Sequence, residues 1–256
     1  MEWLSPILFV FAVSTASVGG LLLVRRRVHH ASLQKHNDVA GVLLSIVGTL
    51  YAVLLAFVVV VVWEAVGTAG DIADQEAGIL GDLVRDALLF PDPERTELIV
   101  EFHDYAQSVI REEWPAMANG GSSPHVWDLT NRIFLSFAKI KPESPRDINV
   151  HAEMLRRLNE LTARRRSRLL SAGNKVPPLM WYLLALGGVI TVGFSYFLGV
   201  EKRRTHALMV AALAAMLGLT LYLIVAIDNP FGGAMRVEPD GFQLVLDRME
   251  AGRPGK

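Results

Sequence analysis

The stretch that decides the fold is Val39 to Trp63, VAGVLLSIVGTLYAVLLAFVVVVVW, which contains no Asp, Glu, Lys, Arg or His. An α-helix rises about 1.5 Å per residue, so about 20 consecutive apolar residues cross the hydrocarbon core of a bilayer. A run of this length without a charge is typical of a transmembrane helix and improbable in a soluble core. The stretch therefore predicts a membrane span.

Three more blocks of similar length and composition lie at residues 4–24, 179–200 and 207–227. We therefore predict an all-α integral membrane protein with four transmembrane helices arranged as two hairpins, residues 1–63 and 177–227. Arg25, Arg26 and Arg27 follow the first block, whereas a signal peptide carries its positive charges before its apolar region. We expect the first block to be retained as a span.

Residues 64–176 predict a water-exposed helical bundle between the two hairpins. Small and apolar residues recur at steps of three and four from Val66 to Ala87, which indicates that span two continues as a helix beyond the membrane. A helix over 147–172 is expected to continue into span three in the same way. Residues 228–256 form a C-terminal tail, in which Asn229 to Phe231 either caps the bundle or lines a vestibule.

The charge of this predicted bundle is uneven along the chain. Residues 64–128 hold 14 acidic and 3 basic side chains, whereas residues 129–176 hold 4 acidic and 11 basic ones. Two interpretations are open. The asymmetry is expected where helix faces complement one another inside the bundle, and also where a basic helix binds lipid head groups or an anion.

Basic residues in short loops near span ends favour the cytoplasmic side of a membrane. Arg25 to Arg27 and Lys35 lie in the first hairpin loop, and Lys202 to Arg204 lie in the second. This distribution predicts that both loops face the cytoplasm and that the central domain lies on the outer side. Arg164 to Arg166, close to span three, oppose this orientation, but long translocated segments follow the rule less strictly.

Small residues recur inside the spans, where close helix packing requires them because lipid supplies no hydrophobic drive for association. The helix-packing candidates are Gly41 and Gly48 in span two, and Gly187, Thr191, Ser195 and Gly199 in span three. Packing within one chain explains these stripes, as does a subunit interface or a pore lining. If span two lines a pore, the pore-lining candidates are Ser45, Thr49 and Ala52.

Charged side chains lie only at the ends of the spans. Asp38, Glu64 and Asp228 are pore-mouth candidates, because rings of carboxylates attract cations in an oligomer. Ordinary helix capping and interfacial solvation account for them equally well. The spans themselves lack the mid-membrane ionisable residues of proton-coupled transporters, which disfavours that class.

No catalytic constellation stands out, and we expect no enzyme and no cofactor. The chain has no cysteine, which excludes thiol chemistry and cysteine-ligated metals. His29, His30 and His36 lack carboxylates at ligand spacing, so no metal site is expected. A net charge of −1 gives no reason to expect a nucleic-acid partner.

Several motifs together resemble the bacterial bestrophin-like domain family, whose members have four spans and an uncharacterised function. They are residues 36–41 (HNDVAG), 51–64 (YAVLLAFVVVVVWE), 166–170 (RSRLL), 177–181 (PPLMW), 228–233 (DNPFGG) and 236–239 (RVEP), followed by Phe242. The resemblance covers nearly the whole chain and implies a multi-pass protein of the bacterial inner membrane.

Bestrophins proper are homopentameric anion channels, so the resemblance implies a homo-oligomeric ion channel with span two lining the pore. Span two departs from the bestrophin pattern, because it offers Tyr51 and Phe57 in place of a tight phenylalanine neck. The alternative function is a non-conducting membrane scaffold or sensor whose helical domain binds a partner or lipid. The expected partners are membrane lipid, further copies of the chain and, for a channel, ions.

Overall fold

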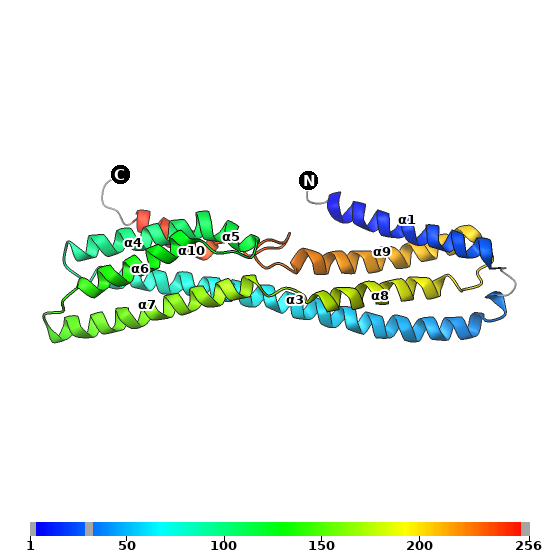
Figure 1. Ribbon diagram of the computed structural model, residues 1–256, viewed down its shortest axis with the longest axis horizontal. Helices are drawn as coiled ribbons and strands as arrows, with labels where there is room; N and C mark the ends of the chain where they lie inside the picture. The colour runs from blue at the N-terminus through cyan, green and yellow to red at the C-terminus, as the bar shows by residue number, and fades with distance from the viewer. Residues whose placement is uncertain (1–3, 29–32, 252–256) are drawn as a thin grey trace. The chain divides into compact units, whose positions relative to one another are not determined.

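The computed structural model describes residues 4–28 and 33–251, which are helical with short connections and contain no strand (Figure 1). The helices are α1 (Leu4–Arg27), α3 (Asn37–Ala87), α4 (Glu94–Ser108), the π-helix η1 (Val109–Glu113), α5 (Trp114–Ala118), α6 (Pro124–Lys139), α7 (Pro145–Ala172), α8 (Pro178–Ser195), α9 (Arg203–Ile227) and α10 (Asp240–Ala251). The chain divides into an apolar unit, residues up to 63 with 176–228, and a polar unit, residues 64–175 with those from 229 on.

The apolar unit contains the helices that are long and apolar enough to cross a membrane. These are α1, α3, α8 and α9, judged by length and composition. At most 28% of the most apolar window of each helix is buried, so most of their apolar side chains lie on the surface of the single chain. A soluble protein rarely exposes so large an apolar surface, which suits contact with lipid or with other subunits.

Within the apolar unit, α1 packs along α9, and α9 also contacts α8. A small buried cluster joins these three helices through Leu21 of α1, Val192 of α8, and Val210 and Ala214 of α9. Gly20 of α1 lets the side chain of Tyr196, which follows α8, approach closely, because a Cβ at position 20 would lie 2.7 Å from the tyrosine hydroxyl oxygen. Small residues therefore do set helix contacts inside this unit.

Tyr51 joins α3 to α8. Its hydroxyl donates a hydrogen bond of 2.7 Å to the carbonyl oxygen of Leu184, and its ring lies against Gly187. A Cβ at position 187 would lie 2.5 Å from two ring carbons, closer than real Cβ contacts come. The position therefore requires glycine as long as the tyrosine ring stays in place.

The two basic loops lie at the same end of the apolar unit. The guanidinium group of Arg25 donates to the carbonyl oxygen of Val200, and the Asn37 side-chain oxygen accepts the Gly199 amide at 2.6 Å. A Cβ on Gly199 would lie 2.5 Å from the backbone nitrogen of Gln34, so this junction also needs glycine. These contacts place the start of α3 beside the connection between α8 and α9.

Span two continues beyond the membrane segment as predicted, since α3 runs unbroken for 51 residues. The expectation that a bundle helix continues into span three is wrong. α7 ends at Ala172, and α8 begins at Pro178 after a non-helical connection. Pro177 and Pro178 lack the amide hydrogens that a helix needs there, and a proline disfavours helical backbone in the residue before it. α8 also ends at Ser195, earlier than the expected end of that span at residue 200.

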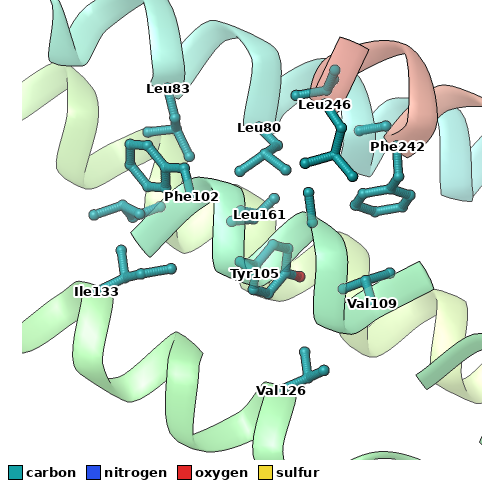
Figure 2. Close-up of a cluster of buried hydrophobic side chains, with 14 of the residues drawn as sticks. Leu80, Leu83, Phe102, Tyr105, Val109, Val126, Ile133, Leu161, Phe242 and Leu246 are labelled. Atoms are coloured by element: carbon teal, nitrogen blue, oxygen red, sulfur yellow. The ribbon is translucent and has the colours of Figure 1, made fainter. Parts of the chain in front are cut away.

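The polar unit is a helical bundle around one apolar core. Figure 2 shows Leu80 and Leu83 of α3 facing Phe102 and Tyr105 of α4, with Leu161 of α7 close by. Local signals start two of its helices. Ser123 caps α6, and Ser144 forms a reciprocal capping box at the start of α7.

The segment expected as a C-terminal tail completes this core. α10 buries Phe242 and Leu246 in it (Figure 2). Before α10, Phe231 is 1% exposed and packs edge-on against Trp114 with ring centres 5.4 Å apart. The Asn229 side chain donates a 2.9 Å hydrogen bond to the Ala118 carbonyl oxygen. Asn229 to Phe231 therefore caps the bundle, one of the two alternatives left open by the sequence.

Replacing Gly187 with alanine tests the contact between α3 and α8. The new Cβ would overlap the Tyr51 ring, so Gly187→Ala is expected to destabilise the protein by about 1–3 kcal/mol. Gly193→Ala is the matched control on the same helix, because a Cβ there meets nothing within 4 Å. Thermal unfolding in detergent should show a lower Tm for the first variant alone. Equal Tm values would mean that the tyrosine ring moves aside at no cost.

Candidate functional site

The membrane segment of α3 presents three different faces, and one of them is packed against the rest of the chain. Tyr51, Leu55, Val58 and Val62 form a buried stripe, each 5–6% exposed. Their spacing of three and four residues places them on one side of the helix. This stripe anchors α3 within the apolar unit and leaves the other two faces uncovered.

The second face is small and partly polar. Ser45, Thr49, Ala52 and Ala56 are all exposed and lie roughly 120° around the helix from the packed stripe, at 100° per residue. The Ser45 hydroxyl donates to the carbonyl oxygen of Gly41 at 2.9 Å, so its hydrogen is satisfied within the helix. The face thus combines small volume with weakly polar oxygen atoms.

The third face carries large apolar side chains that suit lipid. They are Val39, Ile46, Leu50, Val53, Phe57 and Val61, between 49% and 68% exposed. A helix that faced lipid on every unpacked side would have no reason to separate small from large residues. The separation on α3 marks the small face as the one suited to another protein surface or to a pore.

The other small residues fall into two groups. Gly187 lies against Tyr51, and Gly199 lies against Gln34. Thr191 and Ser195 are buried, and their hydroxyls donate hydrogen bonds to carbonyl oxygens of α8. A Cβ on Gly41 or Gly48 would meet no atom within 4 Å. The span-three residues therefore pack within the chain, whereas the glycines of span two border open space.

The three candidate pore-mouth carboxylates occupy different settings. Asp38 and Glu64 are exposed and lie 26 residues apart on α3, which corresponds to roughly 39 Å along the helix. Asp228 is half-buried, and its Oδ1 accepts the Val176 amide at 2.6 Å. Asp228 therefore holds the chain just before α8, a structural role that the sequence left open.

The structure also reveals a buried ionic network in the polar unit that sequence reasoning did not find. Arg168 of α7 is fully buried, and its guanidinium donates to both carboxylate oxygens of Glu76 on α3 at 2.7 and 3.0 Å. The same group donates to Glu113 at 2.8 Å. Arg165 binds Glu113 through two more hydrogen bonds of 3.1 and 2.5 Å. Two arginines thus neutralise two glutamates.

Aromatic groups enclose this ionic network. Trp114 and Phe242 place their rings 5.2 and 5.7 Å from the guanidinium carbon of Arg168, within the range of cation–π attraction. The Tyr105 hydroxyl donates to Glu76 at 2.7 Å, and burial raises the pKa of Tyr105 well above its ordinary value. Burial is the largest single effect and would lower the pKa of Arg168, but the charge and hydrogen bond of Glu76 together with the charge of Glu113 and the contribution of Tyr105 make the net shift upward. The guanidinium group therefore stays charged.

The π-helix η1 brings Glu113 into this network. A π-turn inserts one extra residue into a helix and rotates everything after it around the axis. With η1 between α4 and α5, Val109 and Glu113 are buried, while Arg111 and Glu112 between them are exposed. The turn thereby presents one carboxylate to Arg165 and Arg168 and its neighbour to the surface.

The network uses nearly all of its donors internally. The Glu76 and Glu113 carboxylates are saturated by arginines, and the remaining nitrogen of Arg168 points to the sulfur of Met117 at 2.7 Å. Its role is therefore to position α3, η1 and α7. Among the residues that the structure describes, no group of three or more His, Asp or Glu side chains suits a metal ion, and His29 and His30 lie outside those residues.

Comparison with known proteins places the chain in a family. A family model described as Bestrophin-like domain matches residues 11–242, most of the sequence. The chain belongs to the bestrophin-like domain family, as its motifs indicated, and its apolar helices make it a multi-pass membrane protein. No curated protein and no solved structure matches it.

Removing one arginine tests how much the network stabilises the polar unit. Arg168→Met leaves Glu76 and part of Glu113 buried without their partner, and the expected cost is about 3–5 kcal/mol. Arg166→Met is the control, because Arg166 is exposed on the same helix and forms no ion pair with any described residue. Urea or thermal unfolding should separate the two variants clearly. Similar stability of both would show that the carboxylates become protonated or find water at little cost.

Proposed function

We propose that this protein is a homo-oligomeric ion channel whose pore is lined by the small face of α3, with Ser45, Thr49 and Ala52 toward the axis. The observation that carries the proposal is the separation of faces on α3. From residue 45 to residue 56, small and hydroxyl-bearing residues form one exposed stripe, which exposed Trp63 continues with a large ring, and large apolar residues form another. A single α3 helix cannot enclose a path, so the pore requires several copies arranged around an axis.

The chemistry of the small face suits conduction. Small side chains leave room for an ion and its water, and hydroxyl oxygens offer contacts too weak to trap it. The span carries no ionisable residue that could act as a proton relay, which separates this proposal from a proton-coupled transporter. Family membership adds support by analogy with bestrophin channels, an analogy of fold that is weaker than the chemistry of a site.

The ends of the pore follow from the same arrangement. In the proposed oligomer, Asp38 and Glu64 form acidic rings near opposite ends of the membrane segment of α3. Asp228 contributes a further carboxylate to a mouth of the pore, and its Oδ1 still accepts the Val176 amide. We place the protein in a bacterial inner membrane with the polar unit on the outer side, because Arg25 to Arg27 and Lys202 to Arg204 mark the cytoplasmic end.

A second candidate function is a non-conducting scaffold or sensor that recognises a partner or lipid through its polar unit. The observation that favours it is the surface of α6, where Trp127 and Leu135 are 58% and 65% exposed. Large exposed side chains of this kind are enriched where proteins bind one another. A ring-shaped oligomer with a continuous axial path would favour the channel, and a monomer or a closed axis would favour the scaffold.

Ion flux through reconstituted protein tests the pore lining. Thr49→Phe fills the small face, and we expect it to reduce flux into liposomes at least tenfold, because a phenyl ring narrows the path in every subunit at once. Ile46→Phe is the matched control, since Ile46 lies on the large apolar face and is 52% exposed. Its flux should equal that of the unmodified protein.

Two results would count against the channel. The first is a correctly assembled, unmodified protein that passes no ion at any tested voltage or pH. The second is equal loss of flux in both variants, which would point to damage to the fold or assembly. Size-exclusion chromatography of each variant before reconstitution separates that damage from a blocked pore.

A further inference from the structure

The polar unit contains a surface cavity that neither the buried network nor the proposed pore uses. It measures about 300 Å³ and lies between the end of α4, η1 and the first turns of α6. Its polar lining includes Gln107 and Ser108 of α4, Arg111 of η1, and His125 and Arg132 of α6. The volume is at the lower end of the range for small-molecule sites, about 300–1,000 Å³.

The hydrogen-bond donors that line this cavity have no partners within the described part of the chain. Arg111, Arg132 and His125 form neither a hydrogen bond nor an ion pair with any described residue, and the same holds for the side chains of Gln107 and Ser108. By contrast, the arginines of the buried network use nearly all of their donors. The cavity therefore gathers unused donor capacity from three helical segments.

The cavity also contains two carboxylates, and each has one polar contact within the chain. Glu112 accepts a hydrogen bond of 2.9 Å from Ser123, the residue that caps α6, and Asp104 lies 3.5 Å from the ring nitrogen of His103. Arg111 and Arg132 thus balance the charges of Asp104 and Glu112, and the donors without a partner in the described chain belong to the two arginines and to Gln107, Ser108 and His125. Two guanidinium groups can bind planar oxyanions in a bidentate manner, which favours carboxylate and phosphate groups over neutral ligands.

The π-helix accounts for how the cavity is assembled. Because η1 turns Glu113 inward to Arg165 and Arg168, the preceding residues Arg111 and Glu112 face outward and line the cavity. Neighbouring residues of a helical turn point in different directions, so Glu113 can be buried while Arg111 and Glu112 reach the cavity, and π-turns are found frequently at functional sites. The buried network thereby fixes the backbone that carries one wall of the cavity.

We propose that this cavity, between α4, η1 and α6, binds a small oxyanion through Arg111 and Arg132, with Gln107, Ser108 and His125 as additional donors. The ligand class is a small molecule that carries a carboxylate or phosphate group. The inference is independent of the pore, because every residue involved lies in the polar unit. Failure of conduction would leave this site untouched, and failure of the site would leave the pore untouched.

Calorimetric titration of the full-length protein in detergent tests the site. The probes are sodium phosphate and sodium citrate, each titrated at constant ionic strength with chloride as the balancing anion, so that the two arms separate phosphate from carboxylate recognition. We expect saturable binding of at least one probe. The double variant Arg111→Gln with Arg132→Gln should weaken it at least tenfold, and Arg146→Gln, exposed on α7 outside the cavity, should leave it unchanged.

A second variant gives an effect of opposite sign. Glu112→Gln keeps an oxygen that can accept the Ser123 hydroxyl but removes a negative charge from the cavity, so it should tighten oxyanion binding several-fold. Structural damage would not produce such a gain. The proposal is overturned if the folded protein shows no saturable binding of either probe. It is equally overturned if the double arginine variant binds as well as the unmodified protein.

Discussion

The guanidinium group of Arg168 is the interaction on which the polar unit depends, because it joins three segments that are distant in sequence. Glu76 lies on α3, Glu113 on the π-helix η1, and Arg168 on α7, and all three are fully buried. Removing such charges from water costs several kcal/mol for each ion, and only saturated, well-directed hydrogen bonds offset that cost. Because these hydrogen bonds require a particular geometry, they allow fewer alternative arrangements of the helices than apolar contacts would. We regard the network as a device that selects one arrangement of the bundle.

The helix α3 illustrates how one element meets two solvents. Its membrane segment must satisfy every backbone group internally, which an unbroken helix does, and its surface can then be apolar on all sides. Beyond Trp63 the apolar surface of the helix is reduced to one row of buried residues, with charged residues between them. The row contains Ala69, Ala73, Ala77 and Leu80. Small residues in this row let the neighbouring helices of the polar unit approach closely. The helix is thus continuous in backbone, and its side chains change from a lipid-compatible pattern to a bundle pattern.

Sequence patterns predicted the elements that depend on local chemistry and missed those that depend on contacts between distant segments. The length of Val39 to Trp63 and its lack of charged residues sufficed to predict a span. The recurrence of apolar residues at steps of three and four predicted that its helix continues beyond the membrane. The double proline at 177–178 precedes or opens α8 and keeps α7 from continuing into it, which periodicity alone does not reveal. Glu76 occupies a position in the row of buried residues of α3, and that conflict with its charge was the available signal for the network. Its partners Tyr105 and Arg168 are 29 and 92 residues away, a pairing that one sequence cannot specify.

The arginines of the polar unit fall into two groups, those whose hydrogen-bond donors have partners within the chain and those whose donors have none. The charged groups of the buried network are paired with one another, which reflects the cost of leaving any of them alone. On the surface the same constraint is relaxed, because water can serve as partner, so isolated arginines there carry little information. The cavity beside η1 is an intermediate case. Its donors converge on one space from three helical segments, and the turn that places Arg111 there is held by Glu113 in the network. Convergence of donors from three helical segments on one space is harder to attribute to chance than exposure alone, which is why we assign a ligand to this cavity and not to the charges of α7.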